Sequence, residues 1–468
     1  MVINFATQSY KSRSLPLSAQ RVVNFYAEKE PQDAKSPIAM FGAPGLTQFA
    51  DVGQAPVRGM HVMAGILYVV AGGTLFSVSR TGNPVTLGVG ILGSSVVSMA
   101  DNGFQLIIVN GIAGYLYSTV AGFVTINSPN FFPSDTVTFF DQYFVFDRKG
   151  TNQFFISGIL NGLTYNGLDF ASAEVEPDNV LATINQQENL LIFGQKTIET
   201  WFDSGAANFP FQRVDGATIQ RGCAAAKTPI KEDNAVFFVG DDLIFYRLDG
   251  IFIRRVSTHA VEHAWQQYTT TSDAFTFAYT YEGHKFIVLT FPSQDATWVF
   301  DISTNLWHER ESWDSSNRNL TRWRGNCFAT AYNKLLIGDQ FTGLIGAIDG
   351  NTYTEFGNTI RGLLSGPPIH SDRKRVFISR FELDVEQGVG LTTGQGSDPQ
   401  IMLNWSKDGG RTFSDLQIWN TAGKIGEYNT RLRWLRLGQA RQWIFQVTVS
   451  DPVKRSIISA HADMEAGM

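Results

Sequence analysis

The sequence predicts an all-β protein built around a β-propeller, and three observations predict this fold class. Residues 236–250 (VFFVGDDLIFYRLDG) read as two apolar strands joined by Gly240-Asp241-Asp242, residue types that tolerate the positive φ angles of a tight turn. Six other segments show the same hairpin pattern, at 67–78, 106–118, 143–157, 190–202, 286–301 and 335–349. The hairpins begin 37 to 50 residues apart, which is a spacing typical of propeller blades.

The number of hairpins sets the expected number of blades. A single hairpin is too small to bury its own faces, so several units must stack around an axis. Seven hairpins predict seven blades. Six is the alternative, because the first two spacings are short and the last unit could pair with the C-terminal residues. A long irregular β-sandwich competes with the propeller, but its strands usually recur every ~8–12 residues without this longer period.

Residues 1–55 lie outside the repeat. They are polar and interrupted by prolines, with one apolar stretch at 22–26 and a turn at 42–45. We expect an extended N-terminal arm that lies along another part of the molecule or along a neighbour. The propeller is expected over residues 56–357. Within it, one helix that begins near Ser257 or Thr258 connects two blades.

Residues 358–468 differ in character from the repeats. Gly366-Pro367-Pro368 marks a boundary, and strand-like runs follow at 375–385, 400–405, 432–438 and 443–449. These runs predict a C-terminal β-sandwich-like domain, which could pack with the N-terminal arm. Residues 361–443 hold twelve Lys or Arg against eight Asp or Glu, so this domain is the basic part of an acidic chain.

Composition excludes several classes of protein. The chain has 468 residues, 43% of them hydrophobic and only 17% charged, with a net charge of −6 that does not indicate general affinity for nucleic acid. Two cysteines are too few for a secreted disulfide scaffold. The most apolar window, residues 59–73, is shorter than the ~20 residues of a membrane helix, and the N-terminus lacks the apolar stretch of a signal peptide. We expect synthesis and folding in a cytoplasm, without membrane insertion.

One segment has the residue spacing of a zinc site. His259, Glu262 and His263 match the H-x-x-E-H spacing of inverted zinc peptidases. On a helix the two histidines would share a face and could bind zinc, with the glutamate as general base. No third ligand is evident, and the segment lies between two hairpins. We therefore interpret it as a structural helix and predict no metal, no other cofactor and no catalytic residue.

A second motif indicates a turn. Ser406, Asp408, Gly410 and Thr412 match the Asp-box of sialidase-like propellers, in which the aspartate accepts hydrogen bonds from backbone N–H groups. The box is a structural turn in those enzymes. A sialidase would also need three convergent arginines and a Tyr–Glu pair, and no spacing here singles out such a set. A sialidase-like propeller glycosidase, or a glycan-binding adhesin of a virion, remains the alternative function.

Basic residues of the C-terminal domain are candidates for an interface. Arg431 and Arg433 alternate with Leu432 and Trp434, which places the two charges on one face of a strand. Such groups suit phosphate or an acidic partner, and a solvated sheet face is the alternative interpretation. The complete set of interface candidates is Arg373, Lys374, Arg375, Arg431, Arg433, Arg436 and Arg441.

Seven segments carry a likeness to a known family. They are RVVNFYAE (21–28), GAPGL (42–46), VRGM (57–60), RRVSTHAVEHAW (254–265), LNWSKDGGRTFS (403–414), GEYNTRLRWLRLGQAR (426–441) and DPV (451–453). Taken in order, these segments resemble the packaged-DNA stabilisation proteins of P22-like short-tailed bacteriophages, which are also called tail hub, nozzle or tail accessory proteins. The likeness spans nearly the full length of the chain.

The resemblance implies a structural protein and supplies no catalytic motif. It implies a homo-hexameric ring in the virion tail, below the portal and its head-to-tail adaptor ring. That ring would continue the DNA channel, retain the packaged genome, and dock tailspikes or fibres and the tail needle. Double-stranded DNA would pass through it without sequence-specific binding. Synthesis and assembly would take place in the cytoplasm of the host bacterium.

Overall fold

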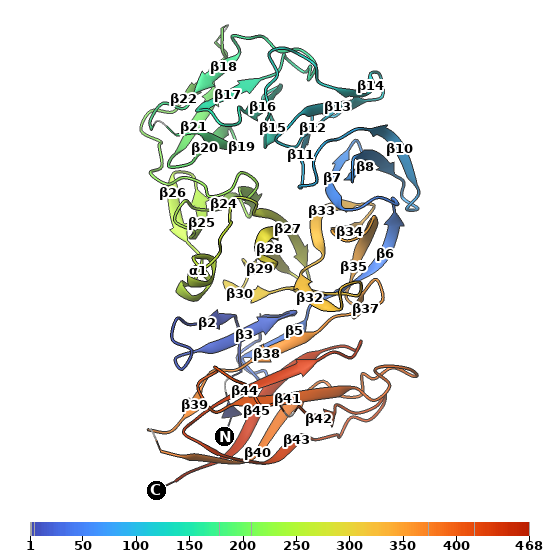
Figure 1. Cartoon of the computed structure of the whole chain (residues 1–468), viewed down its shortest axis with the longest axis vertical. Helices are drawn as coiled ribbons and strands as arrows, with labels where there is room; N and C mark the ends of the chain where they lie inside the picture. Colours follow the sequence, from blue (N-terminus) through green and yellow to red (C-terminus); the bar gives the residue numbers. More distant parts are fainter. Residues whose placement is uncertain are drawn as a thin grey trace.

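The structure confirms the all-β prediction (Figure 1). The computed structural model describes residues 2–3, 5–176, 178–206, 208–372, 374–415 and 417–467. Within these ranges the helices are α1 (His259–Trp265) and the short 3₁₀ helix η1 (Pro292–Gln294). Thr258 caps α1, because its hydroxyl accepts a hydrogen bond from the backbone N–H of Val261 at 3.4 Å. Neither helix has the length and apolar character needed to cross a membrane.

Each of the seven predicted hairpins forms the two central strands of a four-stranded antiparallel unit. Five units are separate sheets made of consecutive strands. The first two comprise β7 (Val57–Met63), β8 (Ile66–Ala71), β9 (Thr74–Val78) and β10 (Pro84–Val89), then β11 (Ser98–Asp101), β12 (Gln105–Val109), β13 (Gly114–Ser118) and β14 (Gly122–Thr125). The next two comprise β15 (Val137–Phe140), β16 (Tyr143–Asp147), β17 (Gln153–Ile156) and β18 (Phe170–Ser172), then β19 (Val180–Gln186), β20 (Asn189–Gly194), β21 (Ile198–Asp203) and β22 (Phe211–Arg213).

The remaining three units complete the series. The fifth comprises β23 (Ile230–Glu232), β24 (Ala235–Val239), β25 (Phe245–Asp249) and β26 (Phe252–Arg255). The sixth comprises β27 (Phe275–Tyr281), β28 (His284–Phe291), β29 (Ala296–Asp301) and β30 (Leu306–Glu309), and it continues into a larger sheet. The seventh comprises β33 (Gly325–Ala331), β34 (Lys334–Asp339), β35 (Leu344–Asp349) and a strand from the N-terminal residues. The two-stranded sheet of β31 (Glu311–Asp314) and β32 (Asn319–Arg322) lies between the last two units in the chain.

The units form a ring, and their first strands line its centre (Figure 1). Neighbouring first strands contact each other in the order β7, β11, β15, β19 and in the order β23, β27, β33, β7. Buried apolar residues fill the spaces between successive units, as in the cluster of Phe237, Phe245 and Phe300 between the fifth and sixth units. Stacking of this kind buries the faces that a single hairpin leaves exposed.

The turn of the 236–250 hairpin differs from the prediction in one respect. The residue with positive φ is Leu243 (φ 59°), rather than Gly240 or the aspartates that follow it. Gly240 is required instead by close approach, because a Cβ there would lie 2.7 Å from the ring of Tyr246. The Asp241 carboxylate binds Arg221 at 3.1 Å. Side-chain contacts therefore explain the composition of this turn better than backbone conformation does.

The N-terminal residues, which the sequence assigns to an extended arm, take part in three sheets. β6 (Gly45–Asp51) pairs along its length with β35 and is the outer strand of the seventh unit. β3 (Ala19–Val23) pairs with β38 (Gly362–Ser365) and touches β30 through one parallel bridge, while β2 (Tyr10–Lys11) pairs with β3. β1 (Val2–Ile3), β4 (Phe25–Lys29) and β5 (Ile38–Gly42) belong to a sheet of the C-terminal module. The partner strands outside the segment are distant in the sequence, so these strands are not parts of the consecutive hairpins. The hairpin repeat therefore does not extend to them.

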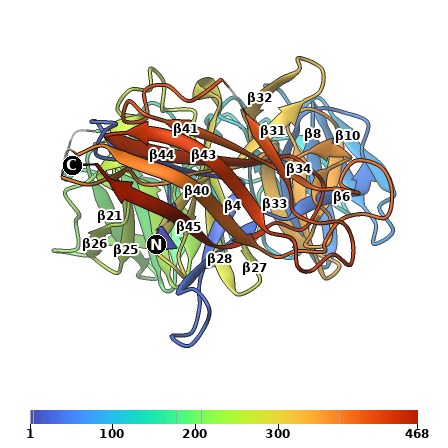
Figure 2. The same cartoon turned by 90° about the horizontal axis from the view of Figure 1, so that it is seen from below.

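The C-terminal module consists of two sheets that enclose one core. The first contains β40 (Val376–Val385), β43 (Leu432–Ala440) and β45 (Ser456–Ala466) with the N-terminal strands β1, β4 and β5. The second contains β38, β39 (Ile369–His370), β41 (Gln400–Ser406), β42 (Ile418–Thr421) and β44 (Gln442–Val449) with β3. The short strands β36 (Thr354–Glu355) and β37 (Asn358–Thr359) lie beside β6. Seen from below, the long strands cross the module with the N-terminus beside β45 (Figure 2).

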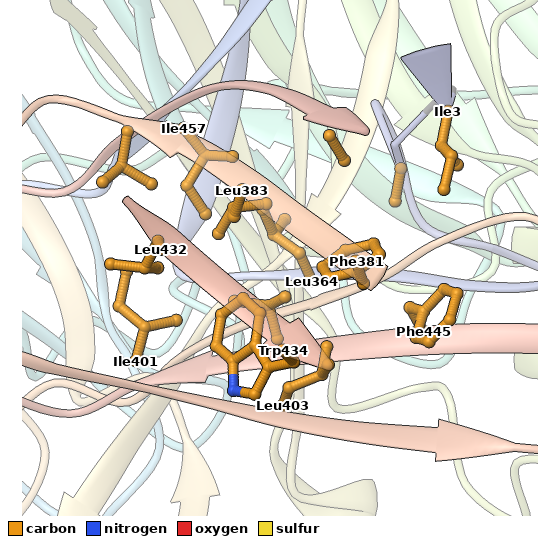
Figure 3. Packing of buried hydrophobic residues seen from close by; sticks show 14 of the residues in the cluster. Ile3, Leu364, Phe381, Leu383, Ile401, Leu403, Leu432, Trp434, Phe445 and Ile457 are labelled. Carbon is orange, nitrogen blue, oxygen red and sulfur yellow. The ribbon is translucent and has the colours of Figure 1, made fainter. Parts of the chain in front are cut away.

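Aromatic and aliphatic side chains from both sheets form the core of this module (Figure 3). The ring of Phe381 on β40 lies 4.4 Å from that of Phe445 on β44 and 5.8 Å from that of Trp434 on β43. Ile3 and Phe25, from the N-terminal segment, are buried in the same core. The first and last parts of the chain therefore fold together.

Candidate functional site

The feature that all seven units share is a cavity on their common axis. It has a volume of about 520 Å³ and is lined by the first strand of every unit. A second cavity of about 660 Å³ opens at the N-terminal ends of these strands, and Lys227 lines both. Two carboxylates in the lining have local partners, since Asp101 binds His61 at 2.6 Å and Asp135 binds Lys149 at 3.0 Å. Sequence reasoning missed this set because its members come from separate strands.

The predicted zinc spacing lies on α1, at the outer edge of the ring (Figure 1). Glu262 is buried, and Arg255 binds both of its carboxylate oxygens, at 2.6 and 2.5 Å. Ser257 donates a further hydrogen bond to this carboxylate at 2.6 Å. His259 is exposed and contacts Arg255, and among the described residues no group of three His, Cys, Asp or Glu side chains, His263 included, could hold a metal ion. The glutamate therefore anchors the helix to β26.

The Asp-box residues form a turn after β41. Asp408 Oδ1 accepts hydrogen bonds from the backbone N–H groups of Arg411 and Thr412 at 3.0 Å, and Oδ2 accepts one from the Thr412 hydroxyl at 2.7 Å. Ser406 Oγ donates to Asp408 at 2.7 Å and accepts from the N–H of Gly410, which has φ 86°. These hydrogen bonds, those from Thr412 above all, hold the pKa of Asp408 well below its usual range. The carboxylate is fully engaged within its own turn.

The described basic candidates lie on or next to one pair of strands, β40 and β43. Arg373 lies outside the described residues. Because β40 and β43 are antiparallel, with Val376 opposite Ala440, the candidates gather towards opposite ends of the pair. Lys374, Arg375 and Arg441 lie at one end, Arg431 and Arg433 lie at the other, and Arg436 lies between them on β43. These residues lie along one strand pair and its ends, but they do not form a single compact cluster.

The basic candidates also differ in their ion pairing. Arg431 forms a two-point pair with Glu382 on β40, at 2.9 and 2.7 Å. Arg433 and Arg436 are exposed, and neither has an ion-pair partner within 4 Å among the described residues. Arg436 sits at a bulge with φ 59°, an unusual conformation for a residue with a long side chain. The two unpaired arginines are therefore the stronger interface candidates.

A polar cluster that the residue patterns did not single out joins the ring to the C-terminal module. Arg21 on β3 binds Glu309 at 2.5 Å and Glu311 at 3.1 Å, and Arg361 binds Glu311 at 2.7 Å. The side-chain amide of Asn24 donates to the carbonyl oxygens of Glu311 and Arg361, at 2.9 and 2.8 Å. The charge of Glu309 raises the pKa of Arg21 above its usual range. Two of these residues, Arg21 and Asn24, lie in the segment RVVNFYAE. The resemblance of that segment to a known family was the only sign in the sequence that they matter.

Together these observations define a class of protein. The zinc-like and glycosidase-like motifs hold a helix and a turn in place, while a ring of β-units and a sandwich are joined through shared strands. This arrangement is that of an all-β protein in which a ring of units and a sandwich form one continuous body.

Comparison with known families identifies the group within this class. The family model described as "Bacteriophage P22 Gp10, beta-propeller" matches residues 6–353, and the model described as "Bacteriophage P22 Gp10, beta-sandwich" matches residues 363–465. The chain belongs to this bacteriophage family. The family descriptions confirm both predicted parts of the fold, the propeller and the sandwich, and the resemblance read from the sequence.

Individual relatives are distant in sequence. The chain is 23% identical over 449 residues to the tail hub protein gp10 of Salmonella phage P22, an alignment that covers 88% of this chain and 89% of the relative. Among solved structures, the computationally designed Ika8 protein superposes with a TM-score of 0.39 and 14% identity, covering 70% of this chain and 99% of that one. The N-terminal domain of Nup159 gives a TM-score of 0.38 and 10% identity, covering 69% and 97%.

Proposed function

We propose that this chain is a structural tail hub protein of a short-tailed bacteriophage, which assembles as a homo-hexameric ring below the portal-adaptor ring. The observation that carries this proposal is the pair of family matches, propeller and then sandwich, which together cover nearly the whole chain. The alignment with the P22 tail hub protein extends over the same length. The protein is a component of the virion tail. Its synthesis and assembly take place in the host cytoplasm.

The junction between the two parts supports a role as a rigid building block. One sheet runs from β27 through β30, β3 and β38 to β42, and the Arg21 cluster reinforces it. A ring with closed rotational symmetry uses different patches of each subunit, so the two patches must keep a fixed relation. We propose three parts: an N-terminal arm over 1–55, a propeller over 56–357 and a sandwich over 358–468. The propeller has seven blades, and β6 from the arm closes the seventh.

The charge distribution supports passage of DNA through such a ring. Each copy carries a net charge of −6, so a ring of copies repels the phosphate backbone rather than binding it. Packaged double-stranded DNA would pass without sequence-specific contacts. Acidic propeller surfaces would face the channel, and the basic face of the C-terminal module would meet the adaptor ring or a neighbouring hub subunit. The remaining surfaces would dock tailspikes or fibres and the tail needle.

The glycosidase alternative is not favoured, although its requirements are clear. A glycosidase needs two carboxylates on either side of the scissile bond, ~5–10 Å apart. Asp408, which gave rise to that alternative, is engaged within its own turn, outside the seven units. Glycan turnover by the purified chain would support the enzyme. Three copies at each spike, rather than a single ring of about six copies in the virion, would support an adhesin on a spike.

The unpaired arginines of β43 provide a test of assembly. The double variant Arg433→Glu/Arg436→Glu reverses two exposed charges but leaves the Arg431–Glu382 pair intact. Native mass spectrometry of the wild-type chain, with and without the adaptor ring, is expected to detect hexamers. The double variant is expected to remain monomeric and folded.

A matched control changes the same amount of charge elsewhere. Arg80 and Lys334 are exposed on the first and seventh units of the ring. The variant Arg80→Glu/Lys334→Glu is expected to assemble like the wild type. Normal hexamers from the Arg433→Glu/Arg436→Glu chain would refute the interface assignment. A wild-type chain that stays monomeric in the presence of the adaptor ring would refute the hub proposal itself.

A further inference from the structure

The axial cavities carry an excess of cationic side chains, although the chain as a whole is acidic. Their lining includes the cations Arg58, Lys149, Lys227, Lys231 and Arg322 and the carboxylates Asp101, Asp135 and Asp273. The pairs Asp101–His61 and Asp135–Lys149 account for two of the carboxylates. Arg58 is fully buried and donates hydrogen bonds to backbone carbonyl oxygens, as in its 2.8 Å bond to Ser95. The other three cations have no carboxylate within 4 Å among the described residues.

Lys227 is the cation that the two cavities share. It precedes β23, lines both cavities, and donates one hydrogen bond, to the carbonyl oxygen of Val96. An ammonium group has three N–H donors, so this bond leaves donors for a ligand. Burial lowers the pKa of Lys227 to about 8. A buried cation that lacks an anionic partner opposes folding, and an anion bound in the cavity would relieve that cost.

Arg322 lies at the end of β32, on the wall of the larger cavity. Its Nη1 atom is buried and has no hydrogen-bond partner in the described part of the chain, while Nη2 donates to Asn326 at 3.3 Å. Asp273, on the same wall, has one buried carboxylate oxygen with no partner among the described residues, and its other oxygen accepts from the N–H of Ser293 at 2.7 Å. Two residues of the cavity wall thus leave one guanidinium donor and one carboxylate acceptor without a hydrogen-bond partner among the described residues.

We propose that the larger axial cavity, of about 660 Å³, is a binding site for a phosphate-type oxyanion, with Lys227 and Arg322 as its cationic ligands. A guanidinium fork and an ammonium group are the partners that phosphate oxygens prefer, and their attraction is stronger away from water. Asp273 selects among anions, because its free oxygen accepts a hydrogen bond from the hydroxyl of hydrogen phosphate. Sulfate has no such hydroxyl near neutral pH and would be repelled. Lys231, in the lining of the first cavity, adds positive potential. The ligand is free inorganic phosphate, because a phosphate monoester is mostly a dianion without a hydroxyl near neutral pH and would be repelled like sulfate.

The site is independent of the hub assignment and is tested on the purified full chain. The thermal midpoint of unfolding is followed as inorganic phosphate, phosphoserine, sulfate or chloride is added at equal ionic strength. Binding to the folded state raises the midpoint. We expect a rise with phosphate that exceeds the rise with sulfate. Phosphoserine is mostly a dianion without a phosphate hydroxyl near neutral pH, so it is expected to raise the midpoint less than inorganic phosphate does, and an equal or larger rise would overturn the selection by Asp273. A response to phosphate no greater than the response to chloride would overturn the proposal.

Variants separate binding from folding. Lys227→Met removes a buried, unpaired cation, so without phosphate its midpoint is expected to equal or exceed that of the wild type, and its phosphate response is expected to vanish. Arg322→Met is expected to lose the same response, whereas the exposed control Lys334→Met keeps it. Asp273→Asn is expected to reduce the difference between the midpoint rise caused by phosphate and the midpoint rise caused by sulfate. An undiminished phosphate response in Lys227→Met would overturn the assignment. Calorimetric titration of the wild type, expected to give one phosphate per chain, decides the question if a variant fails to fold.

Discussion

The substitution Leu46→Ala tests whether an N-terminal strand closes the ring. Leu46 lies on β6, is 1% exposed, and packs among Phe277 and Ile337 of the sixth and seventh units. Truncating a buried leucine removes its transfer free energy and leaves a cavity, which together cost about 3 kcal/mol. At about 2–4 °C per kcal/mol for large domains, the thermal midpoint of unfolding should fall by about 6–12 °C.

The control for this substitution lies two residues further along the same strand. Gln48 is exposed, so Gln48→Ala should change the free energy of unfolding by no more than about 0.5 kcal/mol. Both variants are compared with the wild type by calorimetry and by urea denaturation. If Leu46→Ala is no less stable than Gln48→Ala, β6 does not occupy the outer position of the seventh unit, and the ring is closed in some other way.

Three further predictions concern the sandwich and the pH dependence of stability. Phe381→Ala should destabilise the protein by about 3–5 kcal/mol in urea denaturation, whereas exposed Ser379→Ala should not, and equal midpoints would contradict the core described above. Burial lowers the pKa of His308 from 6.5 to about 3, so between these values the unfolded chain binds the extra proton, and stability should fall on acidification by up to about 1.4 kcal/mol per pH unit. His308→Gln should show a shallower pH slope, and an unchanged slope would count against this cause. Asp408 has a depressed pKa, so its contribution exists above its ordinary value of 3.8 and fades as pH falls through the folded-state value. Asp408→Asn should therefore be less stable than the wild type at neutral pH and converge with it in acid, and a gap independent of pH would contradict the role of the charge.

Features formed by residues close together in the sequence could be predicted. Each hairpin joins two strands through one turn, so its apolar runs and turn residues appear in a single short window. The Asp408 turn and the cap of α1 are local in the same way. The role of β6 was beyond such reasoning, because its pairing with β35 spans most of the chain and one strand carries no period. Gly45, in the GAPGL segment, fits there because a Cβ would lie 2.4 Å from the carbonyl oxygen of Thr352.

The candidate surfaces were predicted only in part. Alternation along 431–434 correctly places arginines on the exposed face of β43 and Leu432 and Trp434 in the core. The two-point pair of Arg431 with Glu382 depends on the register between β40 and β43, which one strand alone does not reveal. The axial cavity was missed for a similar reason. Lys227 and Arg322 lie far apart in the sequence and line the same cavity only when the ring closes.

The most direct test of the central claim is a cryo-electron microscopy reconstruction of the tail of the phage that carries this chain. The account predicts six copies in a closed ring directly below the adaptor, each with a ring of β-units and the sandwich held beside the sixth and seventh of them. Three copies at each spike position instead of one ring below the adaptor, or an absence of the chain from the tail, would contradict it.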